Sequence, residues 1–122
     1  MKTKFTLAIF TAIFLYSCAD TLTNKRILGN WQAVSWVSNG GTALDRNVAT
    51  TQFSFDSTGN YSFVNNGNVE VGTYKVEINN LFTTATGKQE IMVKIVQATV
   101  DTLVFDMNNG GQKETITLQK IP

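Results

Sequence analysis

The chain of 122 residues contains no histidine, one cysteine and one proline, and its 10 basic residues nearly balance its 9 acidic ones. Without histidine, the chain has no Ser–His or Cys–His catalytic pair and no histidine-ligated zinc. One cysteine excludes an intrachain disulfide and a thiolate cluster. A net charge of +1 argues against nucleic acid as a partner, because that binding needs many basic contacts to phosphate.

The carboxylates of the chain form no recognisable acid–base pair. Asp56, Asp101, Asp106 and Glu114 fall near predicted turns, where carboxylates are normally solvated. The spacing from Asp56 to Gly59 suits a turn-capping aspartate better than a metal ligand. We therefore expect no enzymatic activity, no metal site and no cofactor.

Residues 1–17 are predicted to be an export signal. Two lysines precede the apolar run Phe5–Tyr16, which is too short to span a bilayer and has the length of a secretory signal core. The end of this run, Leu15-Tyr16-Ser17-Cys18, resembles a bacterial lipobox. An ordinary signal peptide followed by a free cysteine is the alternative.

The lipobox resemblance implies that Cys18 is lipidated and becomes the new N-terminus, followed by a short tether over residues 18–25. Several acyl chains on one residue would hold the protein at a membrane almost permanently. We therefore expect a lipid anchor in a bacterial cell envelope, with the outer membrane as the expected membrane and its face undecided.

Residues 26–122 form the predicted folded domain, and their pattern is all-β. Short β-rich runs alternate with Gly/Asn/Asp clusters, and no segment shows helical periodicity. Short connections favour an antiparallel meander that closes into an eight-stranded up-and-down barrel, with an open sandwich as the alternative. The predicted strands are residues 30–37, 49–56, 60–64, 69–78, 81–86, 90–97, 102–107 and 114–120.

The fourth run contains a change of phase. Val69 and Val71 share one face, whereas the apolar residues after Gly72-Thr73 have the opposite parity, namely Tyr74, Val76 and Ile78. A β-bulge at Gly72-Thr73 would add one residue and turn both sets inward. We therefore predict a bulge at this position.

Two other strands carry apolar residues on the face opposite to their main apolar set. Met92 and Val96 have this phase in the sixth run, which suggests that the strand is covered on both sides. Trp36 is out of phase with Trp31, and we expect it near the open rim of the barrel or on its outside.

The order of short motifs in the domain carries a family resemblance. Gly29-Asn30-Trp31 resembles the Gly-x-Trp motif that opens the first strand of lipocalins, and further pieces follow it: Phe53-Ser54-Phe55, Gly59-Asn60-Tyr61, Gly72-Thr73-Tyr74, Leu103-Val104-Phe105 and Leu118-Gln119-Lys120. Over residues 25–122 the series resembles the short lipocalin-like lipoproteins of Bacteroidetes. The resemblance implies a lipocalin-like barrel whose closed end is plugged by Trp31 with a basic partner, Lys120 in preference to Lys113.

Two functions of different kinds are compatible with such a barrel. The first is the binding of a small hydrophobic or amphipathic ligand inside it, lined by inward aromatic residues, namely Phe53, Phe55, Phe63, Tyr74 and Phe105. The second is a filled barrel that contacts another envelope protein, with the loop over residues 38–47 and its Asp45 and Arg46 as the contact. A cavity of at least about 300 Å³ would favour ligand binding, and a packed interior would favour the second function.

Overall fold

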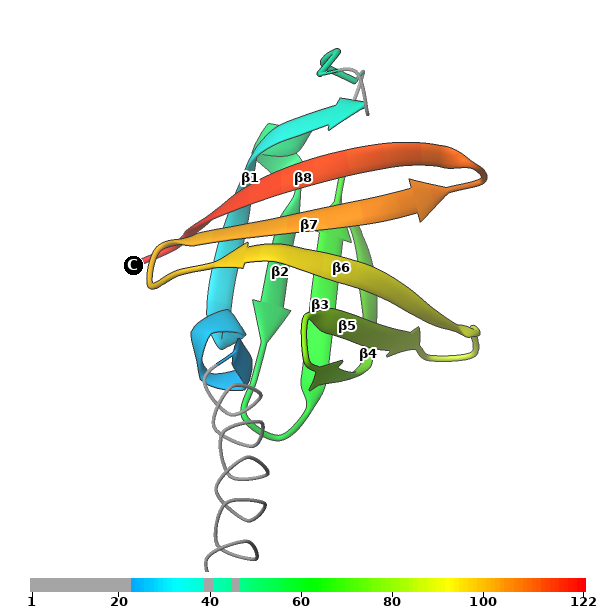
Figure 1. The fold of residues 1–122 in the computed structure, drawn as a ribbon. Coiled ribbons are helices and arrows are strands. Elements are labelled where there is room, and N and C mark those ends of the chain that lie inside the picture. The colour runs from blue at the N-terminus through cyan, green and yellow to red at the C-terminus, as the bar shows by residue number, and fades with distance from the viewer. Residues whose placement is uncertain (1–22, 39–40, 45–46) are drawn as a thin grey trace, which may run out of the picture.

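The computed structural model describes residues 23–38, 41–44 and 47–122, so Cys18, the predicted signal peptide, Asp45 and Arg46 lie outside the described residues. Eight antiparallel strands form one closed barrel in the order of the sequence (Figure 1). This confirms the up-and-down barrel and excludes the open sandwich. The strands are β1 (Gly29–Ser38), β2 (Gln52–Phe55), β3 (Asn60–Asn65), β4 (Asn68–Glu77), β5 (Asn80–Ala85), β6 (Glu90–Ala98), β7 (Thr102–Asn109) and β8 (Gln112–Lys120).

The second strand is shorter than its β-rich sequence predicts. Val48–Thr50 form a 3₁₀ turn, η1, in place of the first residues of the predicted strand. The Thr51 hydroxyl donates to the Asn47 carbonyl over 2.9 Å, and the Gln32 side-chain amide donates to the Val48 carbonyl over 2.7 Å. These side-chain bonds satisfy backbone groups locally and so compete with strand pairing.

The bulge predicted at Gly72-Thr73 is wrong. Strand β4 keeps an unbroken register with both β3 and β5 through this position. Val69 and Val71 therefore point outward, with 65% and 53% of their surface exposed. Gly72 instead permits a close approach of β4 and β5, because a Cβ atom there would collide with the Thr84 carbonyl oxygen of β5.

The last residue of the predicted inward set also points elsewhere. Ile78 follows the end of β4 with a φ of 58°, and 63% of its surface is exposed. A β-branched residue rarely adopts this left-handed conformation, so Ile78 serves the turn into β5 and not the core.

The register does shift in two other strands. In β1 the shift lies between Ala33 and Ser35, and it turns Trp36 to the inside of the barrel, which excludes the outside placement. In β6 the shift lies between Ile95 and Gln97. Met92 and Val96 stay 57% and 54% exposed, so the expectation that β6 is buried on both faces is wrong.

The two ends of the barrel differ. Residues 23–27 form a helical turn, which begins inside the predicted tether and lies against the start of β1 (Figure 1). At this end β8 finishes beside the β6–β7 turn, where the Lys120 N–H donates to the Asp101 carbonyl over 2.9 Å. We call this the closed end and the opposite one, with Trp36, the open end. None of the described helical segments has the length and apolar character needed to cross a bilayer.

Candidate functional site: the open half of the barrel

Trp31 fills the closed end. Its side chain is completely buried, and its indole N–H donates to the Ile27 carbonyl of the helical turn over 2.8 Å. The Lys120 ammonium lies 5.2 Å from the centre of the indole ring and donates to the Leu28 carbonyl over 2.6 Å. The structure thus places together the two residues named from the sequence for closing the barrel, in the geometry of a cation–π contact.

Gly29 explains the glycine of the Gly-x-Trp motif. Its φ of 118° is a conformation that residues with a side chain rarely adopt. A Cβ atom at this position would also lie 2.8 Å from Cε of Lys120. The absence of a side chain at Gly29 therefore leaves room for the Lys120 side chain to reach the Trp31 ring.

The aromatic residues proposed to line a ligand site form one connected cluster. Phe53 stacks on Phe63 with ring centres 4.6 Å apart and meets the edge of Phe105 at 5.8 Å. Phe55 contacts Phe105 at 6.3 Å and Tyr74 at 5.1 Å, both edge-to-face. The order of these contacts runs from the open half towards the closed end.

A cavity of about 210 Å³ lies in the open half, beside the outer part of this cluster. Phe53, Phe63 and Phe105 line it, whereas Phe55 and Tyr74 do not. Its other apolar lining comes from Trp36, Leu81, Ile91, Val93 and Met107. The volume is below the about 300 Å³ that we expected for a ligand site, but it is above the roughly 150 Å³ that accept benzene, so the interior is only partly filled.

Three polar side chains also line this cavity: Tyr61, Glu70 and Thr83. The Tyr61 hydroxyl donates to Oε1 of Glu70 over 2.9 Å. Burial, together with this hydrogen bond to Glu70, raises the pKa of Tyr61 to about 12. At neutral pH the phenol therefore stays protonated and holds the carboxylate in place.

Trp36 is oriented by a second carboxylate. Its indole N–H donates to Oε1 of Glu114 over 2.8 Å, and Glu114 is only 2% exposed. Glu114 stands at the start of β8, opposite Ser38 of β1 and Met107 of β7. The wall of the cavity thus includes an aromatic ring fixed by a buried acidic group.

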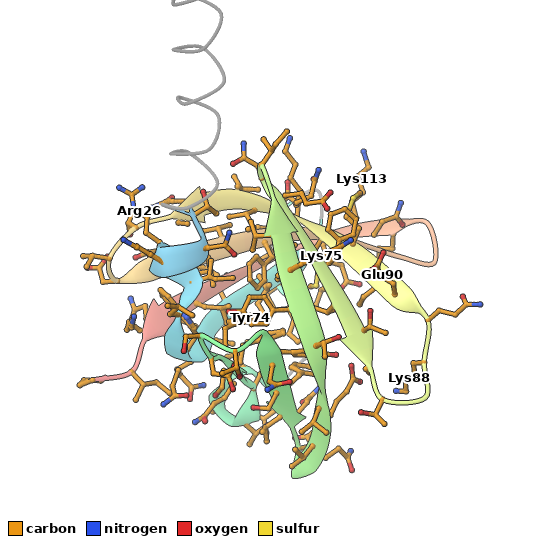
Figure 2. The ribbon with its side chains drawn as sticks, turned by 90° about the horizontal axis from the view of Figure 1, so that it is seen from below. Arg26, Tyr74, Lys75, Lys88, Glu90 and Lys113 are labelled. Carbon is orange, nitrogen blue, oxygen red and sulfur yellow. The ribbon has the colours of Figure 1, made fainter. Side chains whose placement is uncertain are left out.

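A groove of about 430 Å³ adjoins the cavity, and the two share Phe63 and Glu70. The groove runs along the β3–β4 hairpin and the end of β5. On its far side the Lys88 ammonium lies 3.3 Å from Oε2 of Glu70. Figure 2 shows Lys88 and Glu90 at the β5–β6 connection, on the opposite side of the barrel from Arg26. The apolar cavity therefore continues into a more polar opening.

The turn after β2 has the capped geometry proposed from the sequence. Oδ1 of Asp56 accepts hydrogen bonds from the backbone N–H groups of Thr58 and Asn60 at 3.0 and 2.9 Å. The bond from Asn60 lowers the pKa of Asp56 most, with further help from Thr58. Tyr74 donates to the Asp56 carbonyl over 2.6 Å, and burial followed by the charge of Asp56 raises the pKa of Tyr74. Both residues therefore stabilise the β2–β3 turn.

The sequence interpretation missed Glu70, and it left Trp36 undecided between the open rim and the outside. Its expectation that Glu114 is solvated near a turn is wrong, because Glu114 is buried against Trp36. The assumed bulge at Gly72 hid Glu70, since the parity of Tyr74 and Val76, continued without a shift, leads directly to it. An acidic residue at an inward position of a strand was the available signal. Trp36 had no such signal, because nothing in the sequence marks the register shift of β1.

Comparisons with known proteins agree with this architecture. A family model of lipocalin-like domains matches residues 27–105. A lipocalin-like protein from Bacteroides uniformis ATCC 8492 superposes with a TM-score of 0.60 at 15% identity, over 79% of this chain and 99% of that one. A protein from Bacteroides eggerthii DSM 20697 gives 0.61 at 14%, over 78% and 99%, and a redesigned β-barrel gives 0.52 at 16%, over 82% and 96%.

None of the curated proteins matches the chain significantly. The structural neighbours are too distant in sequence to carry more than the fold, whereas the family model covers more than half of the chain. The chain belongs to the family of lipocalin-like domains.

Proposed function

We propose that this protein is a lipid-anchored, non-enzymatic binding protein that holds a small hydrophobic or amphipathic ligand in the open half of its barrel. The observation that carries the proposal is the cavity of about 210 Å³ in the barrel interior. The cavity leaves the apolar surface of Trp36, Phe53 and Phe63 without a packing partner inside it, and an apolar ligand would bury that surface. Lipocalin-like domains share a barrel that suits such containment.

The form of the opening indicates an amphipathic ligand more than a purely apolar one. The cavity accepts about a six-carbon chain or one ring, and the adjoining groove brings Asn65, Asn68 and Glu70 within reach of a polar end. A ligand that spans both spaces would bury its apolar part and keep its head near water. The polar residues of the groove would then bind the head group.

The anchor gives the opening a direction. If Cys18 carries the lipids, residues 18–22 span at most about 18 Å, at about 3.6 Å per residue. The helical turn over residues 23–27 follows at the closed end. This end would then face the membrane, and the open end would face away from it, towards ligand in the aqueous phase.

Filling the cavity tests ligand binding. Val93→Phe adds bulk inside the cavity, whereas Val104→Phe makes the same change on the outer face of β7 and serves as the matched control. Native mass spectrometry of protein purified from its own host should show a bound small molecule in the unchanged protein and the control, and much less in Val93→Phe. A host-purified protein with no bound molecule, or equal loading of all three, would refute the proposal.

The anchor is tested separately by Cys18→Ala, which should release the protein from membranes. Persistent membrane attachment of that variant would refute the lipidation of Cys18. A released protein that still carries its ligand would show that anchoring and binding are independent.

A filled barrel that only contacts another envelope protein is the competing function. The interior of the open half is not fully packed, which weighs against it, while the cavity is smaller than the about 300 Å³ expected for a ligand site. The loop over residues 38–47 would make that contact, and part of it lies outside the described residues. A host complex that survives Val93→Phe unchanged, together with no small molecule in any variant, would favour it.

A further inference from the structure

We infer that the ligand carries a positively charged head group, an alkyl- or arylammonium, and that Glu70 receives it where the cavity meets the groove. This inference rests on the proposed ligand-binding function and adds the chemical class of the ligand. Its basis is the placement of a carboxylate among aromatic rings where the two spaces meet, since Phe63 and Glu70 line both.

Glu70 is held in position for an ionic contact. It lies at an inward position of β4, its side chain is about one-third exposed, and it lines both the cavity and the groove. One carboxylate oxygen accepts the hydrogen bond from Tyr61. The other faces Lys88, whose side chain is 67% exposed. An exposed ion pair of this kind contributes little, so a ligand ammonium can replace Lys88 at Oε2.

The surrounding groups favour a cation over an anion. The rings of Trp36, Phe53 and Phe63 line the cavity beside Glu70, and the faces of aromatic rings attract cations. The buried Glu114, which accepts the hydrogen bond of the Trp36 indole, adds a second acidic group near the cavity without lining it. Among the described residues that line the two spaces, Lys88 is the only cation, and an anionic head would lie beside the Glu70 carboxylate.

Three probes share a six-carbon chain and differ in their head group: hexylammonium, 1-hexanol and hexanoate. They test separately whether the cavity binds an apolar chain and whether the site prefers an ammonium head. Each is titrated into the purified full chain, and the signal of the same buffer and lipid or detergent without protein is subtracted. Hexylammonium should bind about tenfold more tightly than 1-hexanol, and hexanoate more weakly than either, since one charge-assisted hydrogen bond supplies a factor of about this size.

Two variants and a control assign the preference to Glu70. Glu70→Gln should reduce the preference for hexylammonium over 1-hexanol to about twofold or less, with hexanol binding little changed. Lys88→Gln should strengthen hexylammonium binding severalfold, because it removes the competing cation. Glu77→Gln removes a carboxylate on the same strand that pairs with Lys75 outside the barrel, and it should leave all three probes unaffected.

The outcomes are distinguishable. If none of the probes binds, both the ligand-binding function and this inference fail. If 1-hexanol and hexylammonium bind equally, the binding function stands and the ammonium head is refuted. If Glu70→Gln retains the full preference, Glu70 is not the receiving group. Should Glu70→Gln fail to fold, unchanged or weaker hexylammonium binding by Lys88→Gln would overturn the inference by itself.

Discussion

The two tryptophans of β1 belong to two differently built ends of one barrel. At the closed end, Trp31 is fully buried beneath the helical turn, with its indole N–H bonded to backbone and Lys120 over its ring. At the open end, Trp36 is half-buried, bonded to an acidic side chain and set beside a cavity. The closed end is packed in a way that stabilises the fold, whereas the open end leaves apolar surface and the Glu70 carboxylate partly exposed.

Truncating each tryptophan should give the largest difference in stability between the two ends. Trp31→Ala removes a completely buried ring and should lower the free energy of unfolding by about 3–5 kcal/mol. Trp36 borders space that is already partly empty, so Trp36→Ala should lower the free energy of unfolding by only about 1–2 kcal/mol. Urea denaturation measures both. Equal losses would mean that the ends do not differ in their contribution to stability.

Tyr61 makes the open half sensitive to alkaline pH. Its pKa is raised from an unfolded value near 10.0 to about 12, so its contribution is complete below pH 10 and is lost as the pH rises through 12. Loss of this contribution should amount to about 2 kcal/mol.

The measurement is the free energy of unfolding of the unchanged protein and of Tyr61→Phe between pH 9 and 12. The lysines are common to both proteins, so the change in their difference isolates Tyr61. The advantage of the unchanged protein over the variant should shrink or reverse across this range. A constant difference would contradict the assignment, and Tyr74, whose pKa is also raised, should still contribute to the slope in the variant.

Lys120 gives the smallest effect and belongs to the closed end. Lys120→Met keeps most of the aliphatic length but removes the charge over Trp31 and the bond to the Leu28 carbonyl, which should cost about 1 kcal/mol. Lys113→Met is the matched control at the open end and should change stability by less than about 0.5 kcal/mol. A larger loss for Lys113→Met would show that the wrong lysine supports the closed end.

The sequence sufficed for the architecture because its signals are local. Alternating apolar residues and Asn-Gly turns fix the strands and their order, and Gly29 to Trp31 mark the closed end. It did not suffice for register, because a bulge shifts every later side chain to the other face and depends on contacts between strands. We interpreted Gly72 as the site of a bulge, whereas it permits a close approach of strands, and the unmarked shift after Ala33 left Trp36 undecided between the rim and the outside. Both errors affected the predicted orientation of residues that line the cavity, Glu70 and Trp36.

We propose that the open half of the barrel binds ligand while the closed end takes no part. The chain has two tryptophans, so its ¹⁵N–¹H spectrum contains two indole signals, one from each end. Titration with hexylammonium should shift the Trp36 indole signal in a saturable way and leave that of Trp31 in place. A Trp36 signal that does not move, or a Trp31 signal that moves as far, would contradict the account.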